Sequence, residues 1–175
     1  MAEGITETIF ETNLPVTVYV RPMGEKTHEW VEFDQGPGEF SIPVAYDVYL
    51  RVKNINDNEL YNLVKVVAGL PNLTYLNLSE NRKITDMGLS RLAVLPILTR
   101  LNLSSCNITN QGIPHLAALK KLEYLDLSYC NRISDEGLRA LKPLNRLVFL
   151  DLQGCVKTSL AGIRKIERNG LTIHR

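Results

Sequence analysis

Asp126 and Asp151 are the residues whose type and spacing come closest to a chemical site in this 175-residue chain. They occupy equivalent places in two similar segments, which predicts adjacent strands and carboxylates about 5 Å apart. Like charges at that distance raise each other's pKa, and paired carboxylates serve acid–base catalysis or metal binding. Asn77 and Asn102 fill the same place in the two preceding segments. We therefore expect a polar ladder on a solvated sheet, with catalysis as the competing interpretation.

The other reactive side chains give no better candidate. The histidines fall one in each third of the chain, and Cys106, Cys130 and Cys155 are evenly spaced and far apart in the sequence. Zinc ligands usually come in closely spaced pairs, and an odd cysteine count argues against a disulfide framework. The sequence has no nucleophile elbow, phosphate-binding loop or dinucleotide fingerprint. We expect no catalytic residue, no metal site, no cofactor and no enzymatic activity.

Composition narrows the function classes further. Hydrophobic residues make up 45% and charged residues 22%, as in ordinary folded proteins. No apolar run approaches the roughly 20 residues that a membrane helix needs, and the start of the chain lacks the basic residues of a secretory signal. The isoelectric point of about 7.7 lies well below the value of about 9 that is typical of nucleic-acid-binding domains. We therefore expect a cytoplasmic protein that binds neither membrane nor nucleic acid.

The even cysteine spacing belongs to a longer internal repeat. The pattern L-x-x-L-x-L starts at Leu73, Leu98, Leu122 and Leu147, in steps of roughly 25 residues. An Asn or Cys follows shortly after the last leucine of each pattern, and a glycine followed by Leu or Ile comes later. Partial units flank these four, one from Ala45 and one at residues 171–173. Each unit is too small to bury its apolar face alone, so the units must stack.

Within each unit the pattern assigns roles to single residues. Alternation along a strand points Leu76 and Leu78 inward and Tyr75 and Asn77 outward. A buried Asn81 can bond backbone groups of the neighbouring units, and cysteine is small enough to fill the same place. Helix N-caps are expected shortly before each glycine, at Thr85, Thr109, Ser134 and Ser159.

This repeat resembles the leucine-rich repeat family, in particular its cysteine-containing, ribonuclease-inhibitor-like branch. The resemblance covers residues 45–175 and is carried by L-x-x-L-x-L-x-x-N/C together with the segments ITDMGL, ITNQGI and ISDEGL. It implies an α/β solenoid, a short right-handed horseshoe arc with parallel strands on the concave face and helices on the convex face. Relatives in this branch often accompany F-box segments, which implies an alternative role as a substrate-recruiting or effector subunit.

Residues 1–44 do not fit the repeat and form a second unit. Val16, Val18 and Val20 alternate as a strand does, residues 30–33 and 40–42 predict two more strands, and Gly36-Pro37-Gly38 breaks the chain between them. We predict a β-rich N-terminal cap over the first coil of a leucine-rich repeat domain at 45–175, and the tail of an upstream domain is the alternative. Trp30 is expected to pack in the core or the cap, with a partner contact as the alternative.

Charge also separates the two units. The N-terminal unit carries eight acidic and two basic residues, a net charge of −6, and the remainder carries 18 basic and 11 acidic residues, a net charge of +7. This asymmetry favours self-association through the capping ends, with like molecules stacked head to tail.

The outward-facing strand positions are the candidate binding site. The expected first column holds Asp47, Tyr75, Arg100, Tyr124 and Phe149. The second column holds Tyr49, Asn77, Asn102, Asp126 and Asp151, and Tyr129 lies just beyond. Aromatic residues and arginine dominate protein interfaces, although cross-strand stacking that merely stabilises the sheet is the competing interpretation. The sequence thus predicts a protein–protein interaction module that holds a partner protein on its concave strand face.

Overall fold

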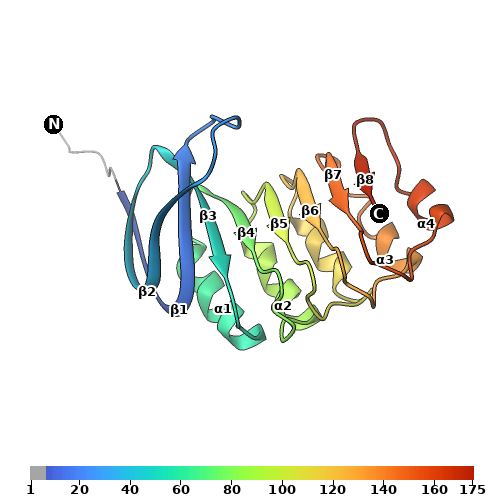
Figure 1. Ribbon diagram of the computed structural model, residues 1–175, viewed down its shortest axis with the longest axis horizontal. Helices are drawn as coiled ribbons and strands as arrows, with labels where there is room; N and C mark the ends of the chain where they lie inside the picture. Colours follow the sequence, from blue (N-terminus) through green and yellow to red (C-terminus); the bar gives the residue numbers. More distant parts are fainter. Residues whose placement is uncertain (1–6) are drawn as a thin grey trace.

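The computed structural model describes residues 7–175, in which eight strands form one curved sheet in the order β2-β1-β3-β4-β5-β6-β7-β8 (Figure 1). The strands are β1 (Glu7–Pro22), β2 (Val31–Pro43), β3 (Tyr46–Val52), β4 (Leu73–Asn77), β5 (Arg100–Asn102), β6 (Tyr124–Asp126), β7 (Phe149–Asp151) and β8 (Thr172–His174). Strands β3 to β8 are parallel, and the β1–β2 hairpin joins them by antiparallel pairing of β1 with β3.

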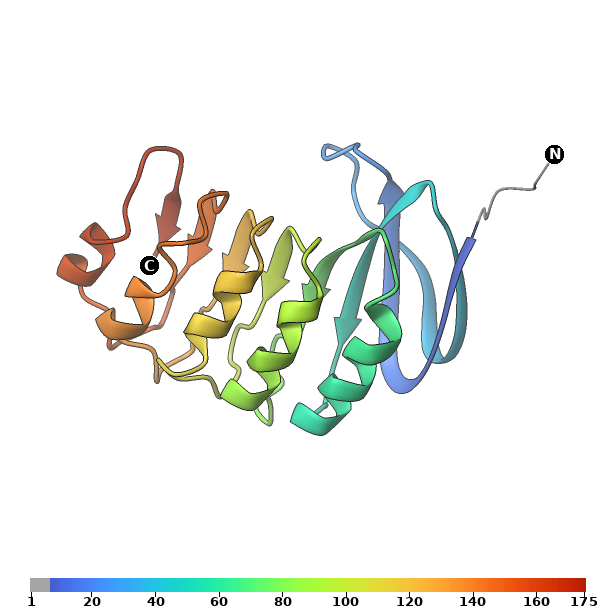
Figure 2. The ribbon, with the colours of Figure 1, turned by 180° about the vertical axis from the view of Figure 1, so that it is seen from behind.

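Helical segments follow the parallel strands and cover one face of the sheet (Figure 2). They are α1 (Asp57–Val67), α2 (Asp86–Arg91), α3 (Asp135–Arg139) and α4 (Leu160–Arg164), with 3₁₀ helices at Leu92–Val94 and Ile113–Ala118. This is the arc of a leucine-rich-repeat solenoid, with strands on the concave face and helices on the convex face, as the sequence predicts. Among the described residues, no helix is long and apolar enough to cross a membrane.

The leucines of the repeat form the core between sheet and helices. Leu76, Leu78, Leu101 and their counterparts in later strands are fully buried, as are the leucines at helical spacing such as Leu89. Each such burial stabilises the fold by roughly 1.5–3 kcal/mol. Because every coil contributes to one continuous cluster, the coils stabilise each other rather than themselves.

The Asn or Cys position joins neighbouring coils through their backbones, as expected. Asn81 Nδ2 donates to Val52 O at 2.8 Å and to Leu78 O at 2.9 Å, and its Oδ1 accepts from Ile55 N at 2.9 Å. In the next coil Cys106 Sγ donates to Leu78 O at 3.1 Å, and the two later cysteines do the same one coil further on. These side chains satisfy backbone groups that would otherwise be buried without a partner.

A second ladder connects each helix start to the next coil and explains the glycine column. Asp57 accepts from both Thr85 N (2.8 Å) and Thr85 Oγ1 (2.5 Å). Asp86, Asn110 and Asp135 make the equivalent bonds to the next coil. A Cβ on Gly88 would lie 2.5 Å from Asp57 Oδ1, and the three later glycines face the same obstruction. Only glycine leaves room for the carboxylate.

Three of the four expected helix caps, Thr85, Ser134 and Ser159, are correct in position, and the fourth, Thr109, is not. Thr85 and Ser159 cap α2 and α4 through their side chains, with bonds from Met87 N and Gly162 N. Ser134 stands at the N-cap of α3, but its hydroxyl accepts from Asn110 instead of capping. The unit after Thr109 forms a 3₁₀ helix that starts later, at Ile113, with Pro114 in its first turn.

The N-terminal segment is one long hairpin rather than three short strands. Strand β2 continues through Gly36-Pro37-Gly38, where we expected a break, because proline is tolerated on an edge strand whose N–H need not pair. The ladder shifts register opposite this point, between Thr12 and Val16. Beyond the shift, Phe10 and Phe40 stack at 4.9 Å and are buried in the same cluster as the repeat leucines. Residues 1–6 of the predicted cap lie outside the described residues.

Candidate functional site

An aromatic row crosses the concave face, from β1 to β7. The rings of Tyr19 and Tyr49 stack at 4.6 Å, and those of Tyr49 and Tyr75 stack at 4.1 Å. Beyond Arg100, the rings of Tyr124 and Phe149 stack at 4.7 Å and are almost parallel. The sheet register brings these side chains together because Tyr75, Arg100, Tyr124 and Phe149 are direct partners across the parallel ladder.

The expected columns are wrong at the first strand. Tyr49, placed in the second column, pairs with Tyr75 in the first, and Arg51 pairs with Asn77. The register shifts between Val48 and Tyr49, so that Leu50 lies beside Leu76 where the sequence alignment had put Val48. Asp47 therefore leaves the row, and its carboxylate instead accepts from the buried Arg21 guanidinium at 3.2 Å.

A connection between β1 and β2, residues 23–30 and here termed the strap, lies over one end of the aromatic row. Trp30 contacts Tyr49 with ring centroids 5.5 Å apart and Tyr75 at 6.3 Å. Arg21 stacks on Trp30 at 4.3 Å, and Lys26 Nζ reaches Glu123 Oε2 at 2.8 Å, next to β6. Trp30 was expected in the core or the cap. It lies on the concave face instead, because the strap folds across the start of the parallel strands.

The strap divides the row into a covered half and an open half. The covered half comprises Tyr49 and Tyr75, which Trp30 contacts, together with Tyr19, which stacks on Tyr49. The open half comprises Arg100, Tyr124 and Phe149, each partly exposed, with the Arg100 guanidinium carbon 5.7 Å from the Tyr124 ring centroid. Within the described residues Arg100 has no carboxylate within ion-pair distance.

Burial fixes the protonation state of these phenols. Burial, followed by the neighbouring Tyr49 phenol, raises the pKa of Tyr75 to about 12. Burial also raises the pKa of Tyr49 and of Tyr124, the latter reinforced by the charge of Asp126. The phenols are therefore neutral at physiological pH, where they can donate hydrogen bonds and present apolar ring faces, which suits recognition rather than nucleophilic chemistry.

The second row holds the candidate carboxylate pair, and hydrogen bonds occupy both members. Asp126 and Asp151 are direct partners in the ladder, as predicted. One oxygen of each accepts from the backbone N–H two residues further on, at 2.9 Å and 2.8 Å. The other oxygen of Asp126 accepts from Asn102 Nδ2 at 3.0 Å, and that of Asp151 lies 3.1 Å from His174 Nδ1. Asn77 and Asn102 make the same backbone bond, so the column closes turns after each strand.

The other side chains that could bind a metal or act as nucleophiles give no better candidate. In residues 7–175, no cluster of three or more His, Cys, Asp or Glu side chains is placed to hold a metal ion. All three cysteines are free and buried, and burial raises the pKa of Cys106 to about 12 and that of Cys155 to about 11. Their thiols are protonated at neutral pH and serve as hydrogen-bond donors to the backbone.

Tyr129 stands apart from both rows. It follows β6 with a backbone φ of 59°, half exposed, and a Cβ added to Gly154 in the next turn would lie 2.6 Å from its ring. Glu80, Ser105 and Gly154 share this left-handed conformation, as each turn after a strand requires. An aromatic residue rarely adopts this conformation, so the backbone is strained at Tyr129, and its role in binding stays a prediction.

Sequence reasoning missed Tyr19, Trp30 and His174 as members of the site. Tyr19 alternates with the buried Val18 and Val20, so its outward direction was readable once β1 was known to pair with β3. The position of Trp30 depends on how the strap folds, which no periodic pattern encodes. His174 follows from the last short strand, where it continues the column of Asp151.

Comparison with known proteins agrees with this architecture. Residues 98–140 match the family described as Leucine Rich repeats (2 copies), and residues 69–93 match the family described as Leucine Rich repeat. No curated protein sequence matches the chain significantly.

Three solved structures are similar to the chain. A chain of the yeast Rad7–Elc1 complex shares 25% identity with a TM-score of 0.57, over 68% of this chain and 30% of that one. Internalin C2 from Listeria monocytogenes shares 31% identity with a TM-score of 0.47, over 63% of this chain and 44% of that one. A chain of the TLR13–ssRNA13 complex shares 23% identity with a TM-score of 0.39, over 58% and 18%.

The chain thus spans less than half the length of each of these proteins. Membership of the ribonuclease-inhibitor-like branch stays a prediction. The regular leucine repeat, the stacked strand–helix coils and the matches over residues 69–93 and 98–140 together show that the chain contains leucine-rich repeats.

Proposed function

We propose that this protein is a protein-interaction module whose partner binds the open half of the concave face. The observation that carries the proposal is the pair of stacked, partly exposed rings of Tyr124 and Phe149 beside Arg100, which has no ion-pair partner among the described residues. Aromatic residues and arginine are the types that supply most interface energy. A partner segment with an apolar side chain for the rings and a carboxylate for Arg100 fits this surface.

The residues around this surface differ in whether they contact the partner or support the sheet and the strap. Tyr129, Asn102 and Asp151 are exposed enough to contact the partner at the rim, whereas Asn77 and Asp126 are buried and support the sheet. Tyr49 and Tyr75 support the strap, which forms the N-terminal wall of the site. The hairpin of β1 and β2 closes the solenoid at that end through Phe10, Phe40 and Ile42, the capping role that we propose for it.

Site-specific photo-crosslinking tests the location. A photoreactive phenylalanine analogue at position 124 or 149 is expected to give the same discrete crosslinked product in a native lysate. The analogue at the exposed His115, on the convex 3₁₀ helix, serves as the matched control. A product from position 115 that is missing from positions 124 and 149 would place the partner on the convex face and refute the proposal.

A second candidate role is that of a substrate-recruiting or effector subunit of a larger complex. The similarity to a chain of the Rad7–Elc1 complex, a two-protein assembly, favours this role. It predicts a stoichiometric second subunit that survives several purification steps with the tagged protein. Recovery of the protein alone at physiological salt would count against a stable complex.

We propose further that the chain catalyses no reaction and that it lies in the cytoplasm. The hydrogen bonds of Asp126 and Asp151 support the first, and three free, buried cysteines support a reducing compartment. Titration of the two carboxylates by NMR, together with calorimetry with divalent metals, tests the first point. Metal binding that Asp151→Asn abolishes would reopen the enzyme hypothesis.

A further inference from the structure

The last full coil differs from the earlier coils at two exposed positions that face away from the preceding coil. Val156 is 76% exposed, and Leu160 is 61% exposed. The earlier coils carry polar residues at the place of Val156, namely Arg82, Asn107 and Asn131. They carry Asp86, Asn110 and Asp135 at the place of Leu160.

In the earlier coils, the polar residues at the place of Leu160 join one coil to the next. Asp86, Asn110 and Asp135 each bond the start of the next helical turn in the following coil. Leu160 has the same position at the start of α4 but cannot make such bonds. An apolar residue here suits an apolar neighbour and not another coil of the same repeat.

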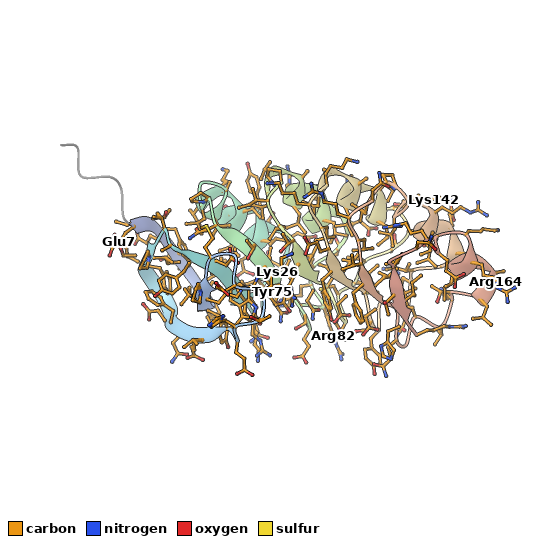
Figure 3. All side chains as sticks on the ribbon, turned by 90° about the horizontal axis from the view of Figure 1, so that it is seen from above. Glu7, Lys26, Tyr75, Arg82, Lys142 and Arg164 are labelled. Carbon is orange, nitrogen blue, oxygen red and sulfur yellow. The ribbon has the colours of Figure 1, made fainter. Side chains whose placement is uncertain are left out.

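Basic side chains surround this apolar end. Residues 156–175 carry five basic residues and one acidic residue, a net charge of +4. The basic residues are Lys157, Arg164, Lys165, Arg168 and Arg175, all exposed except the partly exposed Arg168. Arg164 marks this end of the molecule, opposite Glu7 (Figure 3).

The opposite end has the complementary character. Strand β2 forms the outer edge of the sheet, and its exposed side chains include Val31 and Phe33 at its start. The exposed Ile9 of β1 pairs with Ser41 at the other end of the hairpin. Exposed acidic residues lie among them, namely Glu7, Glu11, Glu32, Asp34 and Glu39. One end therefore carries acidic and exposed apolar side chains, and the other carries basic and exposed apolar side chains.

Strand direction matches as well. Strand β2 is antiparallel to β1, and β1 is antiparallel to β3, so β2 runs in the same direction as β3 to β8. The outer edge of β8 and that of β2 in a second copy would thus pair as parallel strands and continue the sheet in its existing direction. Such pairing joins two different patches, which makes the contact heterologous and leaves both outer ends free for further copies.

We propose that this protein self-associates head to tail, with the basic, apolar C-terminal end of one copy on the acidic, apolar β2 end of the next. The occupant of each end is a second copy because charge, apolar surface and strand direction all correspond between the two ends of the same chain. The concave face is left free, so self-association and partner binding use separate surfaces.

Two variants test the two ends. Val156→Asn with Leu160→Asp gives the C-terminal end the residue types of the earlier coils, and an aspartate in the first helical turn is favourable for folding. Val31→Lys with Phe33→Lys blocks the other end, because lysine on an edge strand opposes pairing. Val94→Asn removes a comparably exposed apolar side chain from the convex surface and serves as the control.

Sedimentation velocity over a concentration series gives the readout. The wild type and Val94→Asn are expected to sediment faster as concentration rises, and added salt is expected to reverse this. Each end variant alone stays monomeric, while an equimolar mixture of the two forms a dimer and stops there, since one intact contact remains. A monomeric wild type at every concentration, or a mixture that stays monomeric, would overturn the proposal.

Discussion

Gly88→Ala tests whether the glycine column exists to make room for the carboxylate of the preceding coil. The added Cβ would lie 2.5 Å from Asp57 Oδ1, 3.1 Å from Ile84 Cγ2 and 3.2 Å from Leu60 Cδ2. The carboxylate must move and lose its two bonds to Thr85, at roughly 1 kcal/mol each for a partly exposed acceptor. Crowding of the two apolar side chains costs about 1 kcal/mol more, and the better helix propensity of alanine returns about 1 kcal/mol. The expected loss in the free energy of unfolding is about 2 kcal/mol.

Urea unfolding of a double-mutant cycle separates this explanation from a general intolerance of side chains. Asp57→Ala removes the obstructing oxygen, so that Gly88→Ala in its presence is expected to cost about nothing, a coupling of about 2 kcal/mol. Gly69→Ala, which has open space around its Cβ, is the control and should stay within about 0.5 kcal/mol of the wild type. Additive effects of Asp57→Ala and Gly88→Ala, or a neutral Gly88→Ala, would refute the reasoning.

Three further predictions concern the ladders and turns. Asn81→Ala removes the side-chain partner of Val52 O and Ile55 N, whereas Leu78 O keeps the Cys106 thiol, and the expected cost in urea unfolding is about 2 kcal/mol. Asn81→Cys is expected to cost less; equal losses would contradict the role of the thiol. Gly154→Ala forces a left-handed residue against the Tyr129 ring and is expected to cost about 2 kcal/mol, whereas no loss would disprove the strain. The hydrogen bonds from Ser159 lower the pKa of Asp135, so its stabilisation is present above the ordinary pKa of 3.8 and is lost as pH falls through the lowered value. In Asp135→Asn the free energy of unfolding should therefore fall less steeply as pH is lowered into the acid range. An unchanged acid dependence would mean that other groups cause it.

The repeated part of the fold was predictable because its information is periodic. A leucine that recurs at a nearly constant interval must face the same side of every coil, which determines strands, helices and core together. The buried Asn81 and the cysteines that replace it followed from hydrogen-bonding capacity and size. Even so, the register of β3 was misplaced, because a local shift at Val48 changes which residues pair without changing the pattern.

The N-terminal part was less predictable because each contact there occurs once. Nothing in the spacing of Trp30 says that the strap folds back over Tyr49 and Tyr75, since that depends on Arg21 pairing with Asp47 and stacking on Trp30. The positions of Arg100, Tyr124 and Phe149 in the row were therefore predicted correctly and those of the covered half incompletely, while binding at this row stays a prediction. The Asp–Thr ladder was also missed, although the Asp and Gly columns that build it are visible in the sequence.

The binding affinity of the crosslinked partner, measured with purified proteins, tests the central claim most directly. The variant Arg100→Ala with Tyr124→Ala removes the guanidinium and one of the two stacked rings, and His115→Ala is the convex control. Two central contacts of this type are together worth about 3 kcal/mol or more, so we expect the dissociation constant to rise at least about 100-fold. His115→Ala should bind as the wild type does, and all three proteins should unfold cooperatively in urea. A folded concave variant with wild-type affinity would contradict the claim that the open half of the concave face holds the partner.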